Sequence, residues 1–282
     1  MEELRHDNTG KFVTLAFSDS ALDDLYNSNK IKTGDNKIDE NEAATLAVRY
    51  FLERWRKETK KSVKHWLITE LGHNETKRIH IHGIIFTNDV EMIKKKWEKY
   101  GLVYIGDYVN ERTINYIVKY VNKVDTVNKG YKPKILCSKG IGSGYLKRID
   151  SKINAYREGE TKEYYRTKSG HKINLPIYYR NNLYTDEERE KLWLKKLDEN
   201  VRYICGEKVD ISQNEDSYYN LLEHYRERNK MLLYGDDTKE WNLQEYKRKS
   251  ELLNYVNKLK KLKDDENKNH TLASKMKANT DF

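Results

Sequence analysis

The sequence predicts an α+β fold of the ferredoxin-like split βαββαβ type, an antiparallel sheet with helices on one face. Short segments rich in β-branched and aromatic residues alternate with longer amphipathic patterns. They follow the order strand, helix, strand, strand, helix, strand. The two central strands are joined by LGHNETKR, whose turn residues suit a hairpin. We therefore expect one sheet face to be covered by helices and the other to be free for binding.

The first half of this pattern begins with a strand. The run FVTLAF at residues 12–17 is short and apolar, as in a buried strand. A polar stretch at 18–37 is predicted to be a loop. Apolar residues then recur three and four positions apart from Ala44 to Trp55, which predicts an amphipathic helix.

The second half adds three strands and two helices. In chain order they are strands at 63–70 and 79–86, a helix that is capped by Asp89 and stops at Gly101, a strand at 102–109 and a helix at 111–123.

Beyond Gly130 the pattern changes. Four regions are predicted: a core at 11–130, a basic, tyrosine-rich extension packed on it at 131–200, a mostly helical C-terminal region at 201–263 and a disordered tail at 264–282. The expected elements are a hairpin at 164–175 that turns at Ser169-Gly170, a helix opened by the capping box Thr185-x-x-Glu188, and helices at 216–233 and 241–263.

The composition narrows the class of protein. The 282 residues include 54 Lys and Arg against 45 Asp and Glu, a net charge of +9, and 22 Tyr. No apolar run is long enough for a membrane span, and the first residues lack the apolar segment of a signal peptide. Cys137 and Cys205 are too few and too far apart for a disulfide framework. A cytoplasmic location and an anionic partner, most commonly nucleic acid, are therefore expected.

The sharpest chemical feature is the sequence His80-Ile81-His82. On a strand, residues i and i+2 share a face, so both imidazoles point the same way. If the hairpin turns near Asn74-Glu75, Glu70 lies directly opposite His80 on that face. Two imidazoles and a carboxylate with open positions suit Mg²⁺ or Mn²⁺. The alternative is an ordinary set of partly exposed side chains on a strand pair.

A second feature is the sequence YIVKY, residues 116–120. On a helix Tyr116 and Tyr120 share a face, and Lys119 lies near Tyr116. A phenol is a weak nucleophile at neutral pH, but a nearby cation and a polarised phosphate lower the barrier to its attack. The alternative is packing. With the metal group about 30 residues earlier, the pattern favours a nuclease that cuts by transesterification.

Five short motifs, in the same order, resemble those of the HUH endonucleases, and within them the rolling-circle replication initiators of small single-stranded DNA phages of the microvirus or gokushovirus type. They are FVTLAF, similar to F-x-T-L-T-F with Ala16 in place of the second Thr; ELG followed by HIHGIIF; YIVKYVNK; KGIG, similar to S-R-x-P-G-I-G without its proline; and GHKINLPIYY, similar to G-x-x-x-x-L-P-x-Y-Y. The resemblance covers roughly residues 11–190.

The resemblance implies a mechanism. Tyr116 would attack the phosphate of a nick site in single-stranded origin DNA, become joined to the 5′ phosphate and release a 3′-OH primer for host DNA polymerase. Tyr120 would act after one round, when the ends are rejoined. His80, His82 and Glu70 would hold the metal, and Lys119 would stabilise the phosphate or phenolate. Since the chain has no Walker A sequence, it would use a host helicase. A phage protein of this kind would act in the host bacterial cytoplasm.

Several alternatives stay open at this point. A non-catalytic DNA-binding protein would explain the charge but not the histidines and tyrosines together. A plasmid Rep or transposase-type nickase would share the chemistry. The basic, tyrosine-rich extension suits either a single-strand channel or a structural cover. The glycines from Gly140 to Gly144 suit a flexible turn or a phosphate cradle, although they form no P-loop.

Overall fold

The computed structural model describes residues 1–28, 40–73, 77–106, 108–122, 124–167 and 169–235, together with Arg248, Glu251 and Tyr255. The chain divides into two compact units, Met1–Gly235 and Asp236–Phe282. In the second unit the three described residues are helical and exposed. Apart from these three, the helix expected at 241–263 and the tail at 264–282 lie outside the described residues.

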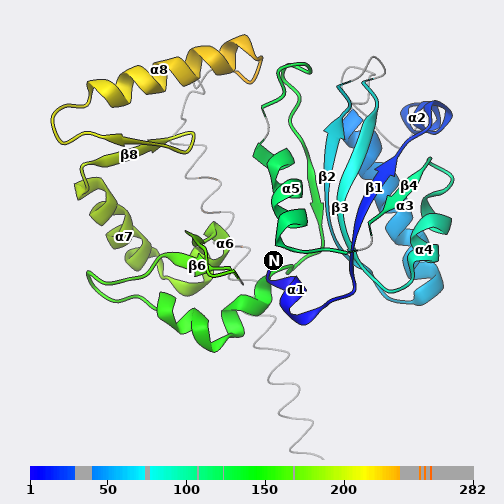
Figure 1. Ribbon diagram of the computed structural model, residues 1–282, viewed down its shortest axis with the longest axis horizontal. Coiled ribbons are helices and arrows are strands. Elements are labelled where there is room, and N and C mark those ends of the chain that lie inside the picture. Colours follow the sequence, from blue (N-terminus) through cyan, green and yellow to red (C-terminus); the bar gives the residue numbers. More distant parts are fainter. Residues whose placement is uncertain are drawn as a thin grey trace, which may run out of the picture. The chain divides into compact units, whose positions relative to one another are not determined.

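The first unit contains a five-stranded sheet whose strand pairs are all antiparallel, in the order β4-β1-β3-β2-β5 (Figure 1). The order of the first four strands is that of a ferredoxin-like βαββαβ unit, so the predicted fold class is confirmed. The fifth strand, on the edge beside β2, was not predicted. The strands are β1 (Gly10–Ala16), β2 (Lys64–Leu71), β3 (Ile79–Phe86), β4 (Val103–Ile105) and β5 (Ile135–Cys137).

Two helices, α3 (Glu40–Thr59) and α4 (Val90–Trp97), cover one face of this sheet. Their apolar stripes bury Phe51, Trp55 and Trp97 against Val13 and Leu15 of β1. Asp89 caps α4 as predicted, since its side chain accepts a hydrogen bond from the Met92 N–H. At about 25 cal/mol per Å² of apolar surface, this burial is the main stabilising contribution to the core.

The loop predicted at 18–37 is wrong over its first part. Residues Asp19–Tyr26 form helix α2, and Ser18 caps it by accepting a hydrogen bond from the Ala21 N–H. The helix buries Ala21, Leu22 and Leu25, three apolar residues within an otherwise polar stretch. Burial of that short stripe against the core outweighs the turn preference of the surrounding Asp and Ser residues. Residues 29–39 lie outside the described part.

The second sheet face is not free, contrary to the expectation. Helix α5 (Glu111–Asn122) crosses it, and Ile114 and Ile117 pack on Ile68, Ile84 and Phe86. The alternation of strand side chains explains this, because β2 and β3 carry apolar residues on both faces. The part of this face that remains polar is therefore confined to one end of the strands.

The strand predicted at 102–109 is shorter than expected, because β4 covers only Val103–Ile105. After it, the Gly106 N–H donates to the Phe12 carbonyl. The two cysteines, Cys137 and Cys205, are exposed free thiols. Within the described residues, no helix has the length and apolar content needed to cross a bilayer.

The pairing of β2 with β3 depends on a close backbone approach at Gly83. This residue lies opposite Leu67. A Cβ at Gly83 would lie 2.2 Å from the Trp66 carbonyl oxygen and 2.7 Å from the Leu67 Cα. Because these are backbone atoms of the paired strand, a side chain can be admitted only if the ladder moves apart.

We therefore expect Gly83→Ala to lower the free energy of unfolding by about 3 kcal/mol. Chemical denaturation followed by circular dichroism measures it. Gly144→Ala is the matched control, because a Cβ there meets nothing closer than 3.7 Å, and a change within about 0.5 kcal/mol is expected. Equal stabilities of the two variants would contradict the close approach.

The chain after β5 forms a second, smaller core. Four buried tyrosines, Tyr145, Tyr165, Tyr179 and Tyr184, pack there with Leu175 and Leu192. The hairpin predicted at 164–175 and the Thr185–Glu188 capping box are both present. The hairpin of β8 and β9 was missed in a region expected to be mostly helical. Its elements are η1 (Ser143–Lys147), η2 (Ile149–Asn154), β6 (Tyr164–Arg166), β7 (Lys172–Asn174), α6 (Ile177–Leu183), α7 (Asp186–Asp198), β8 (Val201–Ile204), β9 (Glu207–Asp210) and α8 (Asp216–Met231).

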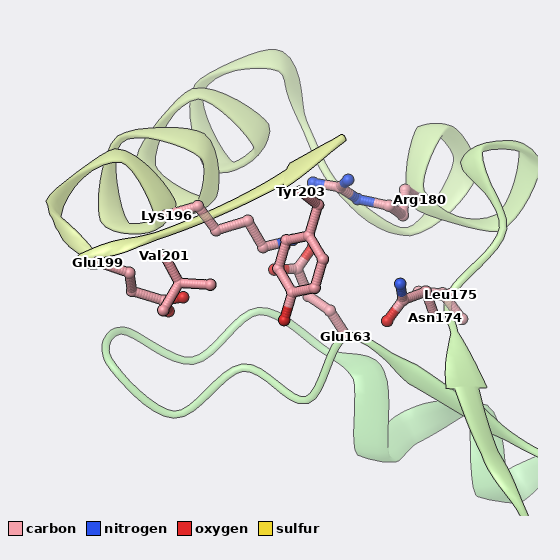
Figure 2. A pocket seen from close by; sticks show the side chains of 8 residues that line it. All are labelled: Glu163, Asn174, Leu175, Arg180, Lys196, Glu199, Val201 and Tyr203. Carbon is pink, nitrogen blue, oxygen red and sulfur yellow. Dashed lines mark ion pairs between the residues drawn. The ribbon is translucent and has the colours of Figure 1, made fainter. Parts of the chain in front are cut away.

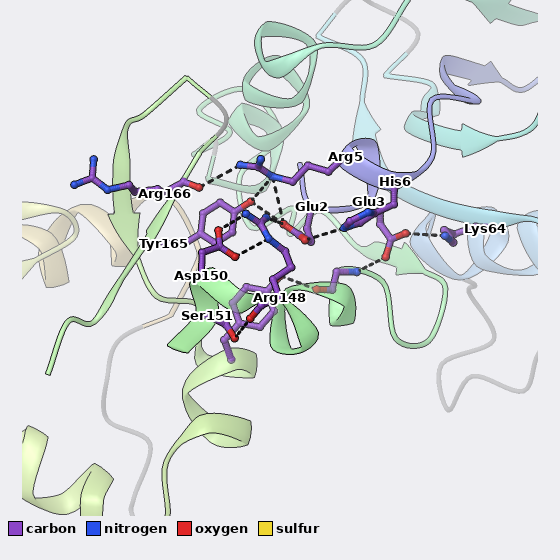
Figure 3. Close-up of polar contacts among 12 residues, drawn as sticks. Glu2, Glu3, Arg5, His6, Lys64, Arg148, Asp150, Ser151, Tyr165 and Arg166 are labelled. Carbon is purple, nitrogen blue, oxygen red and sulfur yellow. Dashed lines mark hydrogen bonds and ion pairs between the residues drawn. The ribbon is translucent and has the colours of Figure 1, made fainter. Parts of the chain in front are cut away.

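A polar network at the first helix, α1 (Glu3–His6), connects this second core to the sheet (Figure 3). The buried Glu2 carboxylate accepts hydrogen bonds from Arg148 Nη1 at 2.8 Å and from Tyr165 Oη at 3.0 Å. Glu3 pairs with Lys64 of β2 at 2.7 Å. Because buried charge pairs lose several kcal/mol when one partner is removed, this network fixes the smaller core against the sheet.

Candidate functional site

Glu70, His80 and His82 form one compact group at the end of β2 and β3. Glu70 lies directly opposite His80 in the strand pairing, which confirms the predicted register. Its Oε2 lies 3.1 Å from His80 Nε2 and 2.9 Å from His82 Nε2. The three potential ligand atoms all lie within 4.8 Å of one another. The strand geometry alone therefore collects two imidazoles and a carboxylate at one point.

The other ring nitrogen of each histidine is already engaged. His82 Nδ1 lies 3.0 Å from Thr14 Oγ1 on the neighbouring strand β1, and His80 Nδ1 lies 3.3 Å from the Arg78 carbonyl oxygen. A carbonyl can only accept, so the His80 Nδ1 bears the proton. Both Nε2 atoms are thus oriented toward Glu70, as in metal sites whose histidines are fixed by outer hydrogen bonds.

A divalent cation fits this donor set. With Nδ1 protonated, a neutral His80 presents a lone pair at Nε2 toward the carboxylate, which is unfavourable unless a proton or cation lies between them. Neighbouring ligands about 2.1 Å from an octahedral ion are about 3.0 Å apart, close to the 2.9 and 3.1 Å found here. The mixed nitrogen and oxygen donors suit Mg²⁺ or Mn²⁺. The group could therefore hold such an ion.

Helix α5 brings two phenols to the same place. The Tyr120 ring stacks on His82 with centroids 4.8 Å apart and an angle of 17° between the planes. Tyr116 packs edge-on against Phe12 at 6.2 Å, and Tyr120 Oη donates a hydrogen bond to Tyr116 Oη. Both hydroxyls therefore lie over the polar end of the sheet, beside the Glu70–His80–His82 group.

The two phenols differ in environment. Tyr116 is 48% exposed, whereas Tyr120 is half-buried. Burial raises the pKa of Tyr120, and its hydrogen bond to Tyr116 and the nearby Glu70 carboxylate raise that pKa further. Tyr120 thus holds its proton and donates it to the Tyr116 oxygen. Such a donor would stabilise negative charge on Tyr116.

Lys119 is exposed on α5. Among the described residues no hydrogen bond or ion pair joins it to Glu70, the histidines or the tyrosines, so its predicted role stays a prediction.

A buried carboxylate positions α5 relative to the β2–β3 hairpin. Asp125, three residues after α5, is 5% exposed. It accepts hydrogen bonds from the Asn128 N–H at 2.8 Å and from His73 Nε2 at 3.2 Å. Asn128 in turn donates to the Gly72 carbonyl. These contacts join the chain after the tyrosines to the residues that follow Glu70, and they hold down the pKa of Asp125 although burial opposes this.

Two residues of the site were not predicted as functional. Phe12 stacks beside His82 and contacts Tyr116, and Thr14 binds His82 Nδ1. Both belong to the FVTLAF strand, and their spacing of two was the available signal, because it places them on the polar face of β1 next to β3.

The extension resolves two open alternatives. Its buried tyrosines form a core rather than a stacking surface, and burial raises the pKa of Tyr145 and Tyr184 to about 12. The Gly142 N–H already donates to Glu3 Oε1 at 2.6 Å, so this part of the glycine turn is bound to the chain's own carboxylate.

A hollow of about 350 Å³ lies in the extension. Figure 2 shows Glu163 between Arg180 and Lys196, at 2.9 and 3.0 Å, with Glu199 also lining the wall. Two acids offset two bases here, so the hollow offers little net attraction to a polyanion.

The comparisons with known proteins concern this same part of the chain. Residues 10–125 match a protein family described as a replication-associated protein of the ORF2 type. This segment holds all six residues predicted for the site, and the match supports a replication-associated protein of the Rep type. No curated protein matches the chain. Among solved structures, the chain is similar to the "Catalytic domain of the Adeno Associated Virus type 5 Rep protein", with 14% identity over 68% of this chain and 99% of that one. The TM-score of 0.22 is too low to support an inference, so the fold assignment rests on the strand order.

Proposed function

We propose that this protein is a rolling-circle replication initiator that nicks single-stranded origin DNA and stays joined to it through a tyrosine. The observation that supports it best is the position of the two phenols. Tyr120 stacks on a histidine of the Glu70–His80–His82 group, and its hydroxyl binds that of Tyr116. A nucleophile and a candidate phosphate-binding cation site therefore lie side by side. The match of residues 10–125 to replication-associated proteins also supports it.

The proposed reaction is a transesterification. The Tyr116 oxygen attacks the phosphorus at the nick, a Tyr–O–P bond forms, and the bond from phosphorus to the 3′ oxygen breaks. The phenol loses its proton, and the leaving oxygen gains one to become the 3′-OH primer. A bound divalent cation would polarise the phosphate. In the reverse direction, a 3′-OH attacks the phosphotyrosine and rejoins the ends.

The residues of this chain supply the positioning. Thr14 and the Arg78 carbonyl orient the histidines, while Ile114 and Ile117 fix α5 on the sheet. Tyr120 is placed to donate a hydrogen bond to the attacking oxygen. Held geometry of this kind can account for a large part of a rate enhancement, up to about 7–11 kcal/mol in well-oriented systems.

The test is formation of the covalent adduct. We expect purified protein, incubated with labelled single-stranded origin DNA and Mn²⁺, to yield a denaturation-resistant protein–DNA band that contains the 5′ side of the cut. The double variant Tyr116→Phe, Tyr120→Phe should yield none. Cleavage without any adduct would refute the tyrosine mechanism and favour hydrolysis by a metal-bound water. A partner helicase and polymerase follow from the proposal, since a nick alone copies nothing.

A further inference from the structure

A second polar surface lies at the same end of the sheet as Glu70 and His80. It is a hollow of about 620 Å³ whose lining includes Lys77, Lys129 and Lys132. Leu71, which follows Glu70 in β2, also lines it. Consecutive Cα atoms are about 3.8 Å apart, and successive side chains point to opposite faces. The hollow therefore begins one residue from the candidate site, on the α3 side of the strands.

The lysines of this hollow are available to an external anion. The lysine ion pairs of the described residues are formed elsewhere, by Lys64, Lys94, Lys96 and Lys196. Lys77, Lys129 and Lys132 are exposed. Glu40 is the one acidic residue in the described lining, so three positive charges face one negative charge. This balance contrasts with the neutral hollow of Figure 2.

The backbone that carries two of these lysines is held by buried hydrogen bonds. Thr69, fully buried, accepts from Tyr131 Oη at 2.9 Å and from the Lys134 N–H at 2.8 Å. Asn41 Nδ2 donates to the Lys132 carbonyl at 3.0 Å. The segment from 129 to 134 is thus fixed to β2 and α3. Lysines on a fixed backbone lose less freedom on binding than lysines on a mobile one.

We propose that this hollow, the lysine groove, binds backbone phosphates of the single-stranded DNA that flanks the nick. The assignment of the strand to DNA at a cleavage site rests on the proposed function. The groove itself is a site for a single-stranded polyanion next to the candidate metal group. It would hold the strand by charge, without reading its sequence, because lysine contacts to phosphates carry no base information.

The test is equilibrium binding of a fluorescent oligothymidylate, measured by anisotropy in EDTA over a range of salt concentrations. We expect the triple variant Lys77→Ala, Lys129→Ala, Lys132→Ala to bind about 10-fold or more weakly near 0.1 M salt, and the slope of log K against log salt to fall by about 2, since each single-strand phosphate contact contributes about 0.7. The control, Lys57→Ala, Lys61→Ala, Lys95→Ala, removes three exposed lysines near the far end of α3, and should bind like the parent protein.

Equal slopes for the two triple variants would overturn the groove, and so would a loss confined to double-stranded DNA or heparin. The proposed function is judged separately, by the covalent adduct. An adduct with unchanged oligothymidylate binding would reject the groove alone, whereas groove-dependent binding without an adduct would reject the tyrosine mechanism alone.

Discussion

Replacing Tyr116 by phenylalanine is expected to lower the rate of the first cut by about 10³-fold or more, because the variant has no oxygen to attack the phosphorus. Tyr116 is the more exposed of the two phenols and accepts the hydrogen bond from Tyr120. The change removes one oxygen and leaves the contact between the Tyr116 ring and Phe12. Single-turnover cleavage of origin DNA with Mn²⁺ measures the effect.

Replacing Tyr120 by phenylalanine is the matched comparison. The nucleophile remains, but its hydrogen-bond donor is lost, so we expect the first cut to slow by about 10-fold, the equivalent of one hydrogen bond of about 1.4 kcal/mol. Rejoining of the ends should be impaired much more. Peptide mapping of the adduct identifies the joined residue. An adduct found only on Tyr120 in the parent protein would reverse the proposed order of the two tyrosines.

The strand pairing at the site was predictable because it follows from two local rules. Alternation along a strand places His80 and His82 on one face, and the turn residues between 71 and 78 set Glu70 opposite His80. The spacing of Tyr116 and Tyr120 likewise follows from helical geometry. Each of these statements involves residues within about one turn or one hairpin of each other.

The contacts between elements could not be predicted in the same way. The sequence did not place α5 on the second sheet face, because apolar residues on both faces of β2 and β3 do not say which helix covers them. The ties from Asp125 to His73 and from Thr14 to His82 join residues 52 and 68 positions apart. They depend on how the helices and strands pack, which no local pattern determines.

The extension illustrates the same limit from the side of composition. An excess of tyrosine and lysine suited a stacking surface for DNA, yet Tyr145, Tyr165 and Tyr179 are buried against each other and beside the Glu2 network. An amphipathic residue can supply either core or surface. The positive charge that we assign to DNA binding lies instead on Lys77, Lys129 and Lys132, of which the first is outside the extension.

Removing one imidazole from the metal group is expected to have the second large effect. We expect His82→Ala to weaken Mn²⁺ binding by about 100-fold or more and to abolish metal-dependent cleavage, because it removes one of three protein ligands. Thr14→Val should have a smaller effect, about 10-fold to 100-fold, since it removes the partner that orients His82 while keeping all three ligands. Isothermal titration with Mn²⁺ measures both.

The histidine control is His171→Ala, a change at an exposed residue of the β6–β7 turn, which should leave Mn²⁺ affinity unchanged. Thermal unfolding gives an independent measurement, because an ion at 100 times its Kd stabilises the folded protein by about 2.7 kcal/mol. That stabilisation should be present in the parent and His171→Ala proteins and absent in His82→Ala. Since Tyr120 stacks on the His82 ring, a His82→Ala protein that still gains stability from Mn²⁺ would place the ion elsewhere and reduce His82 to a packing partner of Tyr120.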